Sequence, residues 1–464
     1  RRHKTLNFGN NILKYRDDII KDLAKLVSIE SVRSEPLEGM PFGKNCAKAL
    51  SCILDMADTM GFATKNVGNY AGHAEYGKGD EVAAVVAHVD IVPAGEGWET
   101  NPFVLTQKGN LLLGRGTADD KGAAIAALYC LKALKDEKVI PKRKLRVIFG
   151  AGEETGSSDL KMYLQSEQMP VIAFTPDSEY GICNREKGIL RLQITSKEKT
   201  SDVVKKFISG TVVNAVPSKA ETFICCAEDE YNKLVENSKD INGIFKFEKI
   251  NNGANIVSIG KASHEMQPQE GFNAATHLLK LLETVFQKDK LGNLISFIND
   301  KIGVELDGKS LNVDFCDKES GPLTLNLGLV NIDEKNCSIG LDIRYPVTAE
   351  GDNIFNNIKN SALKYGLDVI LKKDNKPLFL PEESTFIKLL KDSYFSMTGQ
   401  NANIYSTGGG TYARAFGGRA VAFGPLFADE PDRRLHNANE NIDIDRFMIH
   451  AQICLEAMYR MITF

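Results

Sequence analysis

Val82-Ala-Ala-Val-Val-Ala-His88-Val-Asp90 is the stretch of sequence that decides the fold, because an unbroken apolar run leads directly into a histidine and an aspartate. A short apolar run of this kind is typical of a buried strand in a parallel sheet. Two similar runs follow, at residues 145–149 and 171–174, and an alanine-rich helix is predicted between the first two runs, at 122–134. The alternation predicts an α/β fold in which a mostly parallel sheet is covered by helices.

The segments around this core divide into two kinds. Apolar residues at helical spacing predict amphipathic helices over residues 11–28 and 46–60. After about Gly188, stretches such as Leu190-Arg-Leu-Gln-Ile194 and Leu323-Thr-Leu-Asn-Leu327 alternate apolar and polar residues. A period of two indicates a sheet with one solvated face. Helices are expected within this region near residues 227–238, 273–286 and 352–365.

The change of pattern predicts an inserted domain. A chain of 464 residues is too long for one ordinary core. We therefore expect a first domain built from residues 1–183 and 377–464, interrupted by an α+β domain of two halves at residues 184–376. The charged stretch Lys372-Lys-Asp-Asn-Lys376 suits a hinge between the two domains.

Charge and composition exclude several classes of protein. The chain has 57 basic and 61 acidic residues, so it lacks the excess of positive charge that nucleic acid or an anionic membrane attracts. No apolar run approaches the roughly 18 residues that a membrane span needs. The basic amino end, Arg1-Arg2-His3-Lys4, is not followed by an apolar segment and does not resemble a secretory signal. Nine cysteines without a C-x-x-C pair indicate a reducing compartment, and we predict a cytoplasmic protein.

Side chains that bind metals gather at four places, each just beyond an apolar run or a glycine-rich turn. Because the carboxyl ends of parallel strands meet at one edge of a sheet, these places are expected to lie together. Clustered carboxylates repel one another unless cations neutralise them, which favours a metal site. The four places are His88-Val-Asp90, Asp119-Asp120 after Gly114-Arg-Gly-Thr-Ala118, Glu153-Glu154 after Gly150-Ala-Gly152, and Asp177 after Pro176.

Each of these motifs also has an ordinary explanation. A lone His-x-Asp is often a surface pair, and adjacent acids at a helix start are favoured by the helix dipole. Gly150-Ala-Gly152 after a strand could open a dinucleotide-binding turn. However, Thr155 stands where the third glycine should be, and two glutamates would repel a pyrophosphate. It is the combination of the four that indicates a metal centre.

Together with Leu435-His436-Asn-Ala-Asn-Glu440, these motifs resemble the metal-site motifs of the M20 metallopeptidase family. The resemblance extends over nearly the whole chain, in order and at workable spacing. Within the family, the chain is most similar to the PepV-type bacterial dipeptidases, including the long insert that acts as a lid. The resemblance therefore implies a catalytic domain, residues 1–183 and 377–464, and a lid domain, residues 184–376.

The resemblance also implies roles for individual residues. Glu153 would be the general acid and base, and Asp90 would orient His88. Imidazole and carboxylate ligands suit zinc, with manganese or cobalt as alternatives. A water that bridges two cations is expected to lose its proton near neutral pH, because the pKa of a zinc-bound water is on the order of 7, and Glu153 would pass that proton to the leaving amine. Five side chains would hold the two divalent ions: His88 and Asp177 one, Glu154 and His436 the other, with Asp119 bridging them.

Further motifs in the insert and near the carboxyl end resemble substrate-binding segments of the PepV-type enzymes. These are Thr211–Pro217, Gly260–His264, Leu341–Arg344 and the loop Ser406-Thr-Gly-Gly-Gly-Thr411. By resemblance, His264 would polarise the scissile carbonyl and stabilise the oxyanion. The substrate would be bound by Asn214, Arg344, Gly408 and Gly409.

The predicted function is that of a monomeric dinuclear metal-dependent dipeptidase, which hydrolyses dipeptides or short peptides and binds neither nucleic acid nor membranes. One alternative is an M20 amidohydrolase that removes N-acyl or N-succinyl groups from amino acids. The long insert favours the dipeptidase, because it can close the site without a partner subunit. An inactive binding protein on the same fold is a third possibility, but the complete ligand set and Glu153 argue against it.

Overall fold

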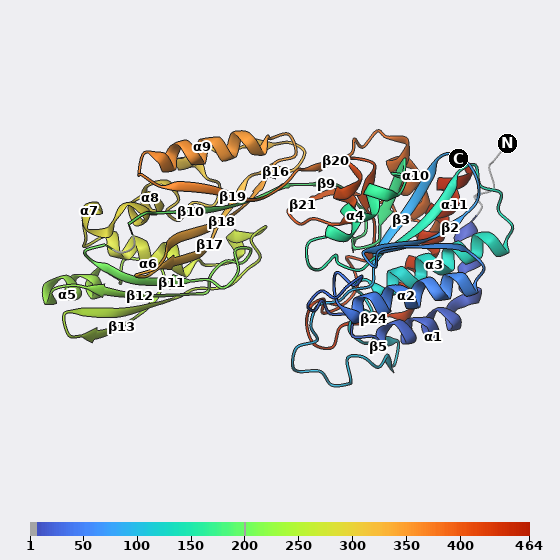
Figure 1. The fold of residues 1–464 in the computed structure, drawn as a ribbon, viewed down its shortest axis with the longest axis horizontal. Helices are drawn as coiled ribbons and strands as arrows, with labels where there is room; N and C mark the ends of the chain where they lie inside the picture. Colours follow the sequence, from blue (N-terminus) through green and yellow to red (C-terminus); the bar gives the residue numbers. More distant parts are fainter. Residues whose placement is uncertain (1–6, 199–200) are drawn as a thin grey trace. The chain divides into compact units, whose positions relative to one another are not determined.

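The structure, a computed structural model, describes residues 7–198 and 201–464 and forms two compact units (Figure 1). The first unit comprises Arg1–Asn184, Leu378–Tyr405 and Gly410–Phe464, and the second comprises Arg185–Pro377 and Ser406–Gly409. The basic amino end, residues 1–4, lies outside the described residues. The second unit thus includes part of the loop Ser406–Thr411 in addition to the inserted segment.

The first unit is built on a nine-stranded sheet in the order β1-β2-β6-β3-β7-β22-β9-β20, with β21 paired to β9. Strands β6, β3, β7 and β22 run parallel and form its centre, whereas β1, β2 and β9 are antiparallel to their neighbours. The strands are β1 Ala63–Val67, β2 Ala71–Tyr76, β3 Val82–His88, β6 Lys144–Gly150, β7 Ile172–Thr175, β9 Ile182–Glu186, β20 Leu378–Phe379, β21 Ile404–Thr407 and β22 Ala420–Ala422.

Every residue of β3 is buried, because both faces of this sheet are covered. Ala83, Val85 and Ala87 belong to one apolar core with the helices α1, α2, α3, α10 and α11. The alternate residues Ala84 and Val86 belong to a second, smaller core with α4 and η4. The predicted α/β class with helices on both faces is therefore correct. The helices are α1 Arg16–Val27, α2 Lys44–Thr59, α3 Lys121–Asp136, α4 Ser158–Ser166, α10 Thr385–Thr398, η4 Tyr412–Phe416 and α11 Ile444–Thr463.

The helix predicted over residues 11–28 is two elements. A 3₁₀ helix, η1 Phe8–Tyr15, precedes the α-helix α1. Gly9, Ile12 and Tyr15 are the buried residues of η1, and their spacing of three matches the three residues per turn of a 3₁₀ helix. The periodicity of the apolar residues predicted a helix correctly but did not distinguish the two turn geometries.

The second unit is built on an eight-stranded sheet in the order β13-β14-β12-β11-β17-β18-β10-β19, and every pair in it is antiparallel. Leu190, Leu192 and Ile194 of β10 share one apolar core with α6, α8 and α9, as the alternating pattern predicted. The strands are β10 Gly188–Thr195, β11 Val204–Ser209, β12 Lys219–Cys225, β13 Ile244–Ile250, β14 Gly253–Ile259, β17 Thr324–Ile332, β18 Cys337–Tyr345 and β19 Asp368–Asn375. The helices are α5 Glu228–Asn237, α6 Ala274–Glu283, α7 Lys288–Leu291, α8 Asn293–Lys301 and α9 Gly351–Leu363.

Small elements complete both units. A three-stranded sheet in the order β24-β5-β4 joins the chain just before α11 to the segment that leads into α3. Its strands are β4 Thr106–Lys108, β5 Leu111–Leu113 and β24 Asn441–Asp443. The other short elements are β8 Ser178–Glu179, β23 Pro425–Leu426, β15 Cys316–Asp317, β16 Gly321–Pro322, η2 Pro268–Glu270 and η3 Lys309–Leu311. Over residues 7–198 and 201–464, no helix is both long and apolar enough to cross a membrane.

Candidate metal centre

Three of the four predicted clusters meet at one edge of the first unit's sheet. His88 ends β3, Glu153 and Glu154 follow β6, and Asp177 follows β7. Because β6, β3 and β7 are parallel neighbours, their carboxyl ends lie side by side. Asp119 reaches the same place by another route, from the turn between β5 and α3, and β5 belongs to the small three-stranded sheet.

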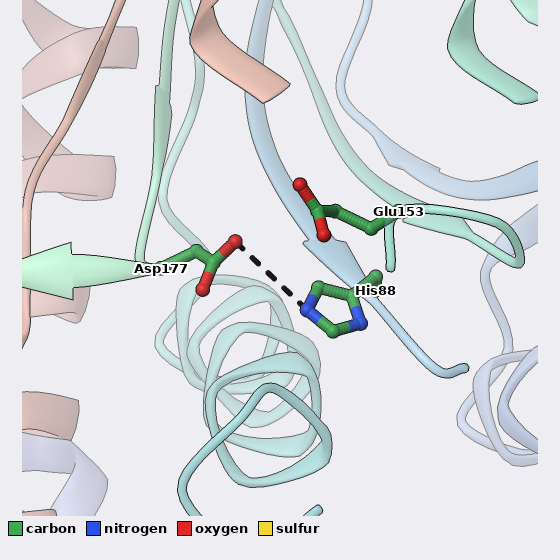
Figure 2. Close-up of side chains that lie close together, drawn as sticks. All are labelled: His88, Glu153 and Asp177. Atoms are coloured by element: carbon green, nitrogen blue, oxygen red, sulfur yellow. Dashed lines mark ion pairs between the residues drawn. The ribbon is translucent and has the colours of Figure 1, made fainter. Parts of the chain in front are cut away.

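The side chains from these elements converge on one another. The ligand atoms of His88, Glu153 and Asp177 all lie within 4.8 Å of one another, as do those of His88, Asp119 and Glu154. The Nε2 atom of His88 is 3.0 Å from Asp119 Oδ1 and 3.8 Å from Asp177 Oδ2. Figure 2 shows His88, Asp177 and Glu153 facing a common centre. A buried imidazole and four half-buried carboxylates thus lie close together at this edge of the sheet.

His436 joins this group from the loop that precedes β24. Its Nε2 atom is 3.1 Å from Asp119 Oδ2 and 3.2 Å from Glu154 Oε1. The two carboxylate oxygens of Asp119 therefore face two different histidines, His88 and His436. His436 also has a φ of 59°, in the left-handed region, where non-glycine residues are uncommon and often belong to functional sites.

Asp90 has more contacts than the sequence suggested. The Nδ1 atom of His88 is 3.0 Å from the backbone oxygen of Asp90 and 3.5 Å from its carboxylate. Because a carbonyl oxygen can only accept, Nδ1–H donates, which leaves Nε2 facing the carboxylates. The Asp90 carboxylate itself accepts the N–H groups of Glu153 and Glu154, each at 3.1 Å. Asp90 therefore orients one histidine and also holds the turn that carries two glutamates.

The two histidines lie in a strongly negative environment. Hydrogen bonds with Asp119 and Glu154 raise the pKa of His436 to about 10. Burial by itself would lower the pKa of His88, but its hydrogen bonds with Asp119 and Asp90 raise that pKa well above the ordinary value. Both imidazoles are thus favoured in the charged form, which means that this place in the fold is stabilised by positive charge.

The acidic groups respond to the same crowding. Burial, with the neighbouring carboxylate of Glu154, raises the pKa of Glu153 to about 8. Burial and the charge of Asp119 raise the pKa of Asp177 well above its ordinary value. Asp120 is fully buried; its Oδ2 accepts the N–H of His88 at 3.2 Å, and its Oδ1 is among the buried oxygens of the described residues that have no hydrogen-bond partner.

These observations fit divalent cations. Carboxylates that are held partly protonated by burial and mutual repulsion can ionise when positive charge is placed among them. A single carboxylate between two histidines can serve two ions, and imidazole nitrogen with carboxylate oxygen is a ligand set that zinc accepts. The donor atoms therefore suit a centre with two metal ions.

Glu440 supports the candidate centre, and sequence analysis gave it no role, although it lies in the quoted motif four residues after His436. Its buried carboxylate accepts hydrogen bonds from the Arg115 side chain at 2.7 Å and from the backbone N–H groups of Gly116, Ala118 and Asp119 at 3.0, 2.9 and 3.1 Å. Four donors on one carboxylate fix the turn that presents Asp119. The motif gave the only signal of this role, because an acidic residue close to a ligand can be a ligand, a base or a support.

Replacing Glu440 by glutamine is expected to weaken metal binding and lower kcat/KM by about 10- to 100-fold, the usual effect of losing a partner that orients a ligand. The glutamine side chain has one acceptor oxygen and no negative charge, so it cannot replace the carboxylate as the acceptor of all four hydrogen bonds. Isothermal titration of the metal-free protein with Zn²⁺, together with peptidase assays, measures both effects. Glu456→Gln is a matched control, because Glu456 is equally buried and accepts from Gly9 N–H and Arg460 but lies outside the centre. Equal behaviour of the two variants would contradict the role of Glu440.

The remaining predicted residues belong to the second unit. An isolated β-bridge pairs Ala215 with His264, so the segment around Asn214 lies beside that histidine. Arg344 Nη1 donates to the backbone oxygen of Gly408 at 2.6 Å, and Gly409 follows in the same loop. The second unit thus brings the predicted substrate-binding residues into two small groups.

Arg344 is also engaged by acidic partners that the sequence analysis did not identify. Its Nε donates to Asp342 at 2.6 Å, and its guanidinium forms an ion pair with Glu265. Asp342 pairs in addition with Arg191 at 2.6 Å, and Glu265 lies 3.0 Å from the ring of His264. Arg344 is only 3% exposed. It is therefore a buried member of an ion network, whereas an arginine on a strand is most often solvated.

Comparison with known proteins agrees with these features. The sequence of residues 84–460 matches Peptidase family M20/M25/M40. The chain is 33% identical over 468 residues to the Bacillus subtilis (strain 168) protein named "Putative dipeptidase YtjP", covering 98% of this chain and 100% of that one. The match therefore extends over nearly all of this chain and the whole of the relative.

Two solved structures share the fold. The M20 family metallo-carboxypeptidase Sso-CP2 from Sulfolobus solfataricus superimposes with a TM-score of 0.60 at 16% identity, covering 96% of this chain and 100% of that one. The dipeptidase Dug1p from Saccharomyces cerevisiae gives a TM-score of 0.58 at 14% identity and full coverage of both chains. At such low identity these similarities concern the fold alone.

Proposed function

The chain belongs to Peptidase family M20/M25/M40, and we propose that it is a dipeptidase that uses two divalent metal ions, of the PepV type. The observation that carries the proposal is the placement of Asp119, whose two carboxylate oxygens lie 3.0 Å from His88 and 3.1 Å from His436. A carboxylate that lies between two imidazoles can bridge two metal ions. The name of the full-length Bacillus subtilis relative supports dipeptides as the substrates.

In this proposal, five side chains would hold the ions. His88 and Asp177 would bind one, Glu154 and His436 the other, and Asp119 would bridge both. Bound divalent ions would polarise the scissile carbonyl and lower the pKa of a water toward neutrality. Zinc is our proposal for both ions, with manganese or cobalt as alternatives, because the donors are imidazole nitrogen and carboxylate oxygen.

Glu153 is proposed as the general acid and base. Its carboxyl lies beside His88 and Asp177, and burial with the neighbouring charge of Glu154 raises its pKa to about 8. A group with a pKa in that range can accept the proton of the attacking water and then donate it to the amine of the departing residue. Asp90 supports both functions, because it holds the Glu153 backbone and orients His88.

The second unit is proposed to act as the lid. His264 would donate a hydrogen bond to the oxyanion that forms on the substrate carbonyl. Asn214, Arg344, Gly408 and Gly409 would bind the ends of the dipeptide. The ion pairs of Arg344 with Asp342 and Glu265 support a fixed position for its guanidinium, since each removes rotational freedom from the side chain. We also propose a monomer, because the lid is part of the same chain, and a cytoplasmic location, because nine cysteines without a C-x-x-C pair indicate a reducing compartment.

A substrate panel tests the proposal. Unblocked dipeptides, including Xaa-His dipeptides, are expected to be hydrolysed with a kcat/KM at least about 10-fold above that of N-acetyl and N-succinyl amino acids, because the polar groups of the lid would bind both free ends. Release of free amino acids, followed by chromatography, gives the rates.

Faster turnover of the acylated compounds would contradict the proposal of a dipeptidase and would favour an M20 amidohydrolase. Absence of turnover on every compound, with metal bound, would favour an inactive binding protein. The presence of Glu153 beside a full set of ligand-type residues supports an enzyme, because a binding protein has no use for a general base.

A further inference from the structure

The turn that carries the two glutamates is anchored by its backbone. The N–H of Gly152 donates to Asp159 Oδ2 at 2.8 Å, and the next two N–H groups, of Glu153 and Glu154, each donate to Asp90 at 3.1 Å. Three consecutive N–H groups thus end on carboxylate oxygens. Hydrogen bonds to charged acceptors are shorter and stronger than neutral ones, so the two carboxylates define where the turn can lie.

Tyr412 contributes to the same anchor from a distant part of the chain. Its hydroxyl donates to Asp159 Oδ2, the oxygen that also accepts from Gly152. Its ring meets the ring of His88 edge to face, with centroids 6.2 Å apart and an interplanar angle of 89°. Tyr412 and Asp159 are fully buried. A single tyrosine therefore contacts a predicted metal ligand with its ring and supports the glutamate turn with its hydroxyl.

The glycines of Gly150-Ala-Gly152 make this arrangement possible. A Cβ atom on Gly150 would collide with the Tyr412 hydroxyl and would lie 2.5 Å from Asp159 Oδ2. A Cβ atom on Gly152 would collide with the ring of Phe42. The G-x-G pattern after β6, which resembles the start of a nucleotide-binding turn, is thus explained by the close approach of two side chains to the backbone.

We propose that Asp159 and Tyr412 are positioning residues that set the glutamate turn, and through it the carboxylates of Glu153 and Glu154. The proposal rests on the metal centre and on the role of Glu153 given above. Its physical basis is that Asp90 anchors the turn at two N–H groups only. The third hydrogen bond, from Gly152 to Asp159, therefore determines how the turn is rotated. A rotation of the turn would move the base and a metal ligand together, because they are adjacent residues.

The test uses Tyr412→Phe in the full-length, metal-loaded protein. We expect kcat to fall by about 10- to 100-fold while KM changes by less than about threefold, as for other partners that orient ligands. In protein reloaded with Co²⁺, the visible absorption bands are expected to shift, because the position of Glu154 changes. Asp159→Asn, which retains an acceptor for Gly152 but loses the charge, is expected to act in the same direction.

Tyr163→Phe is the matched control. Tyr163 is equally buried, lies on α4 close to Asp159, and its hydroxyl bonds to His73 Nδ1 at 2.8 Å. This variant is expected to keep the wild-type kcat and the wild-type cobalt spectrum. The thermal midpoints of all the variants show whether a loss of stability accompanies any effect.

Wild-type kcat and cobalt spectrum in Tyr412→Phe would overturn the proposal, as would equal losses in Tyr412→Phe and Tyr163→Phe. If Tyr412→Phe does not fold, Asp159→Asn decides by the same two measurements. A wild-type protein that hydrolyses no peptide would refute the proposed function, and the cobalt spectra of the variants would then test the anchor alone.

Discussion

Replacing Glu153 by glutamine is expected to lower kcat by about 10²- to 10⁴-fold, the usual contribution of a general acid or base. The amide has the shape of the carboxyl but can neither accept nor return a proton at neutral pH. The backbone of residue 153 would still donate to Asp90, so the turn is expected to remain in place. Steady-state kinetics with a good dipeptide, together with metal analysis of the same preparation, measure the effect.

Glu154→Gln is the control for this prediction. Glu154 lies 3.2 Å from His436 and is proposed as a ligand, so its variant is expected to lose metal as well as activity. Glu153→Gln is expected to lose activity with near-normal metal content. Intact activity in Glu153→Gln, or the same metal loss in both variants, would show that the base has been assigned to the wrong glutamate.

Removal of the metal is expected to abolish hydrolysis. Dialysis against a chelator should reduce activity to background, and Zn²⁺, Mn²⁺ or Co²⁺ should restore it. Without the ions, the water is not activated, the carbonyl loses their polarising charge, and the carboxylates of the centre are left to repel one another. Because ligands that bind only the folded state stabilise it, the thermal midpoint should fall on dialysis and recover with the metal.

Asp119→Asn, treated in the same way, serves as the reference for this experiment. Asp119 lies between both histidines, and its amide variant is expected to recover little activity at metal concentrations that restore the wild type. Hydrolysis that survives exhaustive chelation would contradict the whole mechanism. The ion that restores activity at the lowest free concentration would decide between zinc, manganese and cobalt.

Much of the fold followed from the sequence because its signals are local. The unbroken apolar run at 82–87 predicted a strand buried on both faces, and the structure divides its residues between two cores. The alternating stretch at 190–194 likewise predicted a sheet with one apolar face. The 3₁₀ geometry of η1 could not be predicted, because the spacing of its apolar residues is compatible with either type of turn over a short length.

The candidate centre was predictable in its members but not in its support. His88, Glu153 and Asp177 stand at strand ends, where a parallel sheet brings side chains together. The supporting residues Glu440 and Tyr412 gave no comparable signal. Glu440 is a single acid within a motif that gives it no role, and Tyr412 is an aromatic residue in a glycine-rich region. Their roles depend on hydrogen bonds to chain segments 253 or more residues away.

By itself, the sequence determined which residue types are available and where along the chain they occur, because strand periodicity and ligand chemistry are properties of short segments. Only the tertiary structure decided how they meet. It placed Asp119 between two histidines from a turn outside the main sheet, and it gave Asp90 a second role as an anchor of the glutamate turn. The physical reason is that hydrogen bonds and ligand contacts act over about 3 Å, and no local pattern specifies which distant atoms the fold brings within that range.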